Sequence, residues 1–180
     1  MTTPSLRRIA KAGFAAAAAA TIAVLYIYAA VQQTYRTGGN DPQIQLAADA
    51  ASALREGANV DVVLPTSVVD LGSGLGVFLI VYDSGNRPIA GSGRLAGVLP
   101  VPPAGVLAVA RAARWHSVTW QPRPDVRVAA VLQRVDDGSG RVVLAARSLR
   151  EVEERTSRLL VMSALAWGSL MLTSVLAVLL

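Results

Sequence analysis

The sequence of 180 residues has no cysteine and one histidine, and aromatic residues make up only 5% of it. The absence of cysteine excludes disulfides and thiol chemistry. One histidine, His116, cannot build a multi-histidine metal site, and the motifs of zinc enzymes are missing. Gly91-Ser92-Gly93 lacks the spacing of a nucleophile elbow. We therefore predict that the protein is not an enzyme and has no catalytic residue, metal or cofactor.

Charged residues are also scarce, at 16% of the chain, and the net charge of +5 is unevenly distributed. Arg7, Arg8 and Lys11 lie in an N-terminal tail that contains no acidic residue. All 12 acidic residues lie in the middle of the chain, where they nearly balance the remaining arginines. Because the excess positive charge belongs mainly to a short tail, we predict no nucleic-acid partner.

Two long apolar runs without a charged residue enclose this middle region, Ala12–Val31 and Leu159–Leu180. An α-helix of roughly 20 residues covers the ~30 Å hydrocarbon layer of a bilayer. The runs predict a tail at 1–11, transmembrane helices at 12–31 and 158–180, and a domain at 32–157. A cleaved signal peptide is the alternative for the first run. That run is longer than an apolar signal-peptide core, and no Ala-x-Ala site precedes Gln32.

The basic tail also predicts the topology of the chain. Basic residues that flank a first transmembrane helix are retained on the cytoplasmic side. Both ends of the chain are then cytoplasmic, and the central domain lies outside. The excess of arginine over lysine and the abundance of alanine and valine are typical of a GC-rich bacterial genome. We predict a location in the bacterial inner membrane, with a periplasmic domain and the lipid bilayer as a partner.

The central region predicts one α+β domain, a five-stranded antiparallel sheet with flanking helices. Asp41 and Pro42 are suited to begin a helix that ends at Gly57, and Pro102 and Pro103 precede a second, shorter helical pattern. Turn residues separate the apolar runs on either side of them. The predicted strands are Val77–Tyr82, Arg87–Ser92, Ser117–Gln121, Val126–Val135 and Val142–Arg147.

This order of elements, the double membrane tether and one hairpin resemble the extracytoplasmic PAS-like or Cache sensor domains of bacterial receptors. The hairpin runs from Val77 through the turn Asp83-Ser84-Gly85-Asn86 to a second strand that ends in small residues, Ala90 to Gly93. The resemblance covers about Asp41 to Ser157. It implies a PAS-like input module, as in two-component systems, that binds a ligand and passes a signal across the membrane.

No kinase or other output region follows the second apolar run in the sequence. We therefore expect either an input module cut from a larger receptor or a protein that acts on a separate membrane partner or as a homodimer. Small residues four apart, Gly13 with Ala17 and Ala164 with Gly168, offer surfaces for helix association. An alanine-rich composition alone is the alternative explanation of these pairs.

A helix that leads out of the domain is predicted from Ser148 onward. Ser148 and Glu151 form a capping box, in which the hydroxyl accepts from the Glu151 amide and the carboxylate reaches back to Ser148. Glu151 with Arg155, and Glu154 with Arg158, are spaced as stabilising i,i+4 pairs. No glycine or proline follows before Leu159, so we expect one continuous signalling helix into the membrane.

The segment around His116 and Trp120 is the candidate ligand-binding site in the sequence. On a strand these two residues share a face, and Arg123 and Arg127 are near them in sequence. An indole wall, an imidazole and a guanidinium suit a small anion or an aromatic acid. Arg94, after the hairpin, is a lesser candidate. The alternative, which we favour, is that Trp120 packs in the core and His116 lies at the surface.

Two functions of different classes remain from the sequence. The first is a sensory, ligand-binding input domain that transmits through its C-terminal helix. The second is a structural or accessory subunit of an envelope complex. A defined cavity favours sensing, whereas a filled core with an exposed apolar patch favours the accessory subunit.

Overall fold

The computed structural model describes residues 6–38 and 41–179, and the chain forms two compact units. The first unit combines the two terminal segments, and the second extends from Gly38 to Glu151. The helices are α1 (Leu6–Gly38), α2 (Asp41–Arg55), α3 (Val60–Val63), α4 (Ala104–Ala113) and α5 (Arg150–Leu179). The strands are β1 (Val69–Asp70), β2 (Phe78–Tyr82), β3 (Pro88–Gly91), β4 (Gly93–Arg94), β5 (Trp115–Arg123), β6 (Val126–Arg134) and β7 (Val142–Ser148).

The first unit contains two helices that are long and apolar enough to cross a membrane. The spans that meet this criterion are Gly13–Gln33 in α1 and Arg150–Leu176 in α5. Large apolar side chains such as Phe14 and Leu165 are exposed along them. The indole Nε1 of Trp167 donates a hydrogen bond to Thr21 Oγ1 at 2.9 Å. The side chains of the basic residues Arg7 and Arg8 lie outside the described part of the chain.

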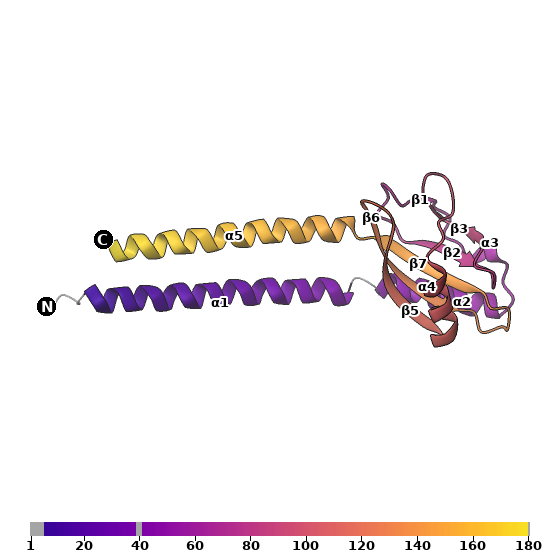
Figure 1. The fold of residues 1–180 in the computed structure, drawn as a ribbon, viewed down its shortest axis with the longest axis horizontal. Helices are drawn as coiled ribbons and strands as arrows, with labels where there is room; N and C mark the ends of the chain where they lie inside the picture. Colours follow the sequence, from indigo (N-terminus) through magenta and orange to yellow (C-terminus); the bar gives the residue numbers. More distant parts are fainter. Residues whose placement is uncertain (1–5, 39–40, 180) are drawn as a thin grey trace. The chain divides into compact units, whose positions relative to one another are not determined.

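The second unit is built on a five-stranded antiparallel sheet in the order β3-β2-β7-β6-β5 (Figure 1). The prediction of an α+β domain with a sheet of this size is confirmed. The last strand in the chain, β7, lies at the centre of the sheet. It joins two hairpins that are each local in sequence, β2 with β3 and β5 with β6.

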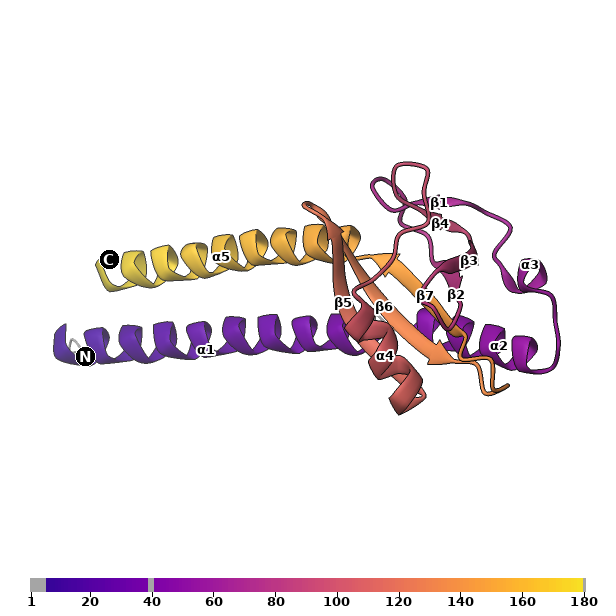
Figure 2. The same ribbon diagram turned by 45° about the vertical axis from the view of Figure 1, so that its right-hand side comes forward.

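β2 is apolar throughout because helices cover both faces of the sheet. In β2, Phe78, Ile80 and Tyr82 belong to the core cluster that includes Leu107 and Ala110 of α4. The intervening residues, Leu79 and Val81, pack with Ala50 and Leu54 of α2 instead. This alternation is the period of two expected of a strand. Figure 2 shows α4 and α2 on opposite sides of the sheet.

The helix predicted at Asp41–Gly57 corresponds to α2, which lies on β6 and β7 through small side chains. Ala47 packs against Val131 and Ala145, and all three are buried. Gln43, one turn earlier, is also fully buried. Neither its Oε1 nor its Nε2 has a hydrogen-bond partner among the described residues. The side chain of Asp41, the predicted helix cap, lies outside the described part of the chain.

The small residues from Gly91 to Gly93 are required by the packing around them. A Cβ atom at Gly93 would lie 2.1 Å from the Phe78 ring, and one at Gly91 would lie 2.9 Å from Leu99. The buried Ser92 hydroxyl accepts from the Leu79 amide at 3.0 Å. A side chain at position 93 would therefore collide with Phe78, and only glycine leaves room for the ring. Beyond this point β4 forms a short parallel pair with β1, which the sequence did not predict.

Candidate functional site

A cavity of about 450 Å³ opens on the α4 side of the sheet beside Trp120, and we call it the Trp120 groove. Trp120 is only 7% exposed and belongs to the core, and it also lines the groove. Most other lining side chains are apolar. The lining residues are Leu95, Val98, Pro100, Val101, Pro102, Pro103, Trp120, Gln121 and Pro122.

The wall of the Trp120 groove is stiff because prolines fix its backbone. The wall is also fastened to the sheet, since the Tyr82 hydroxyl donates to the Pro100 carbonyl oxygen at 2.7 Å. Burial raises the pKa of Tyr82, so the phenol stays protonated and continues to donate. A stiff groove loses little conformational entropy when a ligand binds. Its apolar lining suits a small apolar or aromatic group.

Trp120 is the one ligand residue predicted from the sequence that lines this groove. His116 is half-buried on the same face of β5 but is not among the lining residues. Arg94 is exposed and donates to the Gly97 carbonyl oxygen at 3.2 Å. Arg123 lies beside the loop after β1, where a Cβ at Gly72 would be 3.3 Å from its Nη2.

The backbone of Arg127, the fifth predicted residue, has a structural role. Its carbonyl oxygen accepts from the Leu149 amide at 2.9 Å, and its side chain is exposed. Arg127 is absent from the lining of the Trp120 groove. The structure therefore does not gather the predicted arginines around the indole.

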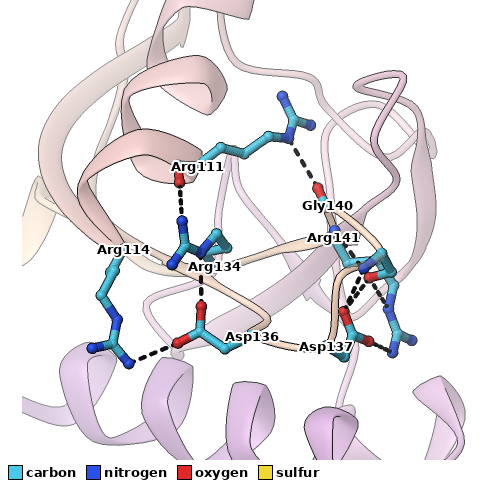
Figure 3. A network of polar contacts seen from close by, with 8 residues as sticks. Arg111, Arg114, Arg134, Asp136, Asp137, Gly140 and Arg141 are labelled. Atoms are coloured by element: carbon cyan, nitrogen blue, oxygen red, sulfur yellow. Dashed lines mark hydrogen bonds and ion pairs between the residues drawn. The ribbon is translucent and has the colours of Figure 1, made fainter.

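A second cavity, of about 510 Å³, lies at the end of α4 and the turn between β6 and β7, and we call it the arginine cavity. It is lined by Arg111, Arg134, Val135, Asp136, Gly138 and Gly140. Figure 3 shows Arg114 and Arg134 directed at Asp136, and Arg111 directed at Gly140. The two glycines have positive φ angles of 77° and 73°. They let the turn close without adding side chains to the cavity.

Arg111 ties α4 to the β2–β3 turn and to the β6–β7 turn. Its Nε donates to the Gly140 carbonyl oxygen at 2.9 Å. Its Nη1 and Nη2 donate to Asn86 Oδ1 and to the Asp83 carbonyl oxygen, each at 2.8 Å. The carbonyl oxygen of Arg111 accepts from Arg134 Nη1 at 2.7 Å, which satisfies a group at the end of the helix.

Asp136 is shared between two arginines. Arg134 Nε and Arg114 Nη2 each donate to one of its carboxylate oxygens at 2.7 Å. These hydrogen bonds, from Arg134 first and then Arg114, lower the pKa of Asp136. The Asp136 carboxylate therefore stays ionised between the two guanidinium groups.

The neighbouring Asp137 accepts hydrogen bonds from residues on the β7 side of the turn. It accepts from Arg141 Nη2 at 2.5 Å and from the Ser139 amide at 2.9 Å. Partial burial opposes ionisation, but the hydrogen bonds from Ser139 and Arg141 outweigh it and lower the pKa of Asp137 to about 2. Arg141 also donates to the Leu54 carbonyl oxygen near the end of α2 at 3.4 Å.

The first turn of α5 is fastened to the domain. Ser148 Oγ accepts from the Arg150 amide at 3.2 Å, so the predicted cap residue does cap the helix. The amide in this bond belongs to Arg150, the first residue of α5. The Glu151 carboxylate pairs with Arg147 at 3.3 Å, and Arg150 Nη2 donates to the Gly72 carbonyl oxygen.

The other residues of the predicted signalling helix lie further along α5. Glu154, Arg155 and Arg158 are exposed within one continuous helix. No ion pair joins Glu154 to Arg158 among the residues that the structure describes.

No protein-family model matches this chain, and no curated protein matches its sequence. The assignment of function therefore depends on the geometry of the two cavities and of the junction between β7 and α5.

Sequence reasoning missed the arginine cavity and most of the Trp120 groove. Arg111 and Arg134 are 23 positions apart, and each taken alone is an ordinary charge at the end of an element. The proline cluster at 100–103 did provide a signal, but we interpreted it only as the start of a helix. Its position against β5 depends on the antiparallel packing of the whole sheet.

Proposed function

We propose that the protein is a membrane-anchored sensory input domain, and that the Trp120 groove binds its ligand. One observation carries this proposal. Trp120 in β5 pairs with Val128 in β6, and Val128 pairs with Ser148 in β7. The groove wall and the cap residue of α5 are therefore members of one cross-strand row.

Through this row, a displacement of Trp120 in the groove can reach Ser148 at the start of α5. A ligand that shifts the Trp120 ring acts on Val128, which is fully buried and has no room to absorb the shift. Val128 is the neighbour of Ser148, whose hydroxyl holds the first turn of α5. Leu149 alone separates β7 from the helix, so displacement of the strand end is passed to α5.

The two long apolar helices support the membrane part of the proposal. In the proposed topology, the domain lies outside the cytoplasm of a bacterial inner membrane and both ends of the chain are cytoplasmic. The PAS-like or Cache resemblance, and a role as a two-component input module, agree with the five-stranded antiparallel sheet and its flanking helices. The ligand is a small apolar or aromatic molecule, because the groove is lined by prolines, aliphatic side chains and one indole.

A binding experiment on the full chain in lipid nanodiscs tests the groove. Trp115 and Trp167 are replaced by phenylalanine so that emission reports Trp120 alone. Benzyl alcohol, benzoate and hexanoate serve as probes. We expect a saturable change in Trp120 emission with at least one probe. A probe at a hundred times its dissociation constant would raise the free energy of unfolding by about 2.7 kcal/mol.

Two valines of similar exposure provide the matched variants. Val98 lines the groove and is 65% exposed, whereas Val62 in α3 is 77% exposed and lies outside it. We expect Val98→Asp to abolish the emission change and Val62→Asp to leave it intact. Equal responses of both variants would contradict binding in the groove.

Transmission is tested separately with spin labels on either side of position 154 in α5. Glu154→Pro interrupts the helix at a cost of about 3 kcal/mol, whereas Glu154→Ala keeps it continuous. We expect the proline variant to lose any probe-induced change in label mobility on the membrane side, while Trp120 still reports binding. Unchanged transmission in the proline variant would show that α5 does not carry the signal.

An accessory subunit that docks an envelope protein remains the alternative function. Val98 and Val101 are exposed at the rim of the groove, and a partner protein could cover them. If no small probe binds, and Val98→Asp abolishes association with a membrane complex while Val62→Asp does not, this alternative replaces the sensory function.

A further inference from the structure

The arginine cavity has a net positive charge, because two arginines, Arg111 and Arg134, and one carboxylate, Asp136, line it. Asp136 accepts from Arg134 and from Arg114, whereas the Arg111 guanidinium donates to uncharged acceptors only. Arg134 also satisfies the helix carbonyl oxygen of Arg111, and cations at a helix C-terminus are favourable. The lining therefore has one more guanidinium group than carboxylate groups.

Arg114 occupies its position at a conformational cost. It has φ 69° and ψ −43°, a region that residues with a side chain rarely adopt. Glycine would adopt this conformation at the end of α4 more easily. The arginine side chain that stands there instead extends to Asp136 at 2.7 Å and neutralises it. Arg134, which lines the cavity, therefore shares its ionic partner Asp136 with a second cation.

The cavity also has room and donors for a ligand. Gly138 has open space around the position of a Cβ atom, and the cavity volume is about 510 Å³. Arg134 Nη2 has no acceptor among the described residues, and Arg111 Nη1 and Nη2 each have one N–H group beyond their single bond. Two guanidinium groups on one cavity match the oxygens of a phosphate group.

We propose that the arginine cavity binds a phosphate group, with Arg111 and Arg134 as its donors and Asp136 as a competing anion. The site is separate from the Trp120 groove, and its lining shares no residue with that groove. The proposal does not depend on the sensory function, because an accessory subunit could hold the same anion.

The test measures the binding of inorganic phosphate to the full chain in detergent by isothermal titration at constant ionic strength. We expect saturable binding by the parent chain. Asp136→Asn removes the competing negative charge and keeps one of the two acceptor oxygens, so we expect phosphate affinity to rise about tenfold. A purely structural Asp136 predicts lower stability and no gain in affinity.

Arginine variants test the donors. Arg134→Gln should reduce phosphate affinity about tenfold or more, whereas Arg55→Gln, a change at an exposed arginine on α2, should leave it unchanged. Glycerol 3-phosphate distinguishes a phosphate ester from the free ion, and tighter binding of either one supports the proposal. The proposal is overturned if phosphate does not saturate the parent chain, if Asp136→Asn does not bind more tightly, or if Arg55→Gln loses as much affinity as Arg134→Gln.

Discussion

The two faces of the central sheet are built differently although they share the same strands. The α2 face is closed by alanines packed on small residues, as where Ala47 contacts Val131 and Ala145. The α4 face is covered by a ten-residue helix and by loops, and both cavities of the domain described above lie at its margins. Both faces have a buried core, and the cavities that we propose as binding sites lie on the α4 face.

The turn between β6 and β7 shows this division in two adjacent residues. Asp136 accepts from arginines that hold the end of α4, whereas Asp137 accepts from Arg141, which bonds the end of α2. One short turn therefore fastens a helix on each face. Changes that act on a single face test how independent the two layers are.

The largest effect is expected on the α4 face at Gly93. Gly93→Ala places a methyl group against the Phe78 ring, which is enclosed in the core, and should lower the free energy of unfolding by about 3 kcal/mol. Denaturant unfolding followed by tryptophan emission measures this change. Gly105→Ala in α4 is the control, because a Cβ there meets no atom within 4 Å. A Gly93 variant as stable as the Gly105 variant would contradict this packing.

The next effect concerns the attachment of α4. Arg111→Met keeps the length of the side chain but leaves three acceptors without their donor, and should cost about 2 kcal/mol of unfolding free energy. Hydrogen exchange should show faster exchange of α4 amides, while α2 amides change little. The control is Arg87→Met, since Arg87 is highly exposed. Equal exchange in both helices would show that the two faces unfold as one unit.

On the α2 face we expect a gain instead of a loss. Gln43→Met removes a buried amide that has no partner among the described residues, and should raise the free energy of unfolding by about 1 kcal/mol. Gln45→Met, on the exposed side of the same helix, should give no such gain. Thermal unfolding of the full chain in detergent compares the two variants. A less stable Gln43 variant would mean that the amide has a stabilising role.

The smallest effect is a pH dependence of the attachment of α2. The pKa of Asp137 lies below its ordinary value of 3.8, so its bond to Arg141 contributes fully above about pH 4 and is lost as the pH falls toward 2. Unfolding measured between pH 5 and pH 2 should show this loss, and Asp137→Asn should flatten the profile. An unchanged slope in the variant would assign the acid sensitivity to Asp83 or Asp136, whose pKa values are also lowered.

The elements of the domain were largely predictable because their signals are local. The apolar run before Asp83 and the turn at Asp136–Gly140 fixed β2 and the β6–β7 hairpin to within a residue or two. Ser148 as the cap of α5 followed from its side chain, although its bonding partner was displaced by one residue. Local propensity and turn chemistry were sufficient for these features.

The sites were not predictable because they depend on contacts between distant segments. Trp120 meets Pro100 only after the sheet has placed β5 beside the loop that precedes α4. Arg111 reaches Asn86 and Gly140, which belong to separate hairpins. The short β1 and β4 pair and α3 were missed for a similar reason, since two to four residues carry no periodic signal.

The central place of β7 has a consequence for the order in which the domain assembles. Each of the hairpins β2–β3 and β5–β6 can form from neighbouring residues, but β2 pairs with β7 across sixty positions or more. Until Val142–Ser148 is available, both hairpins have an unpaired inner edge that is open to aggregation. The segment that closes the sheet is also the one that leads directly into α5, so completion of the fold and formation of the exit helix are expected to coincide during synthesis.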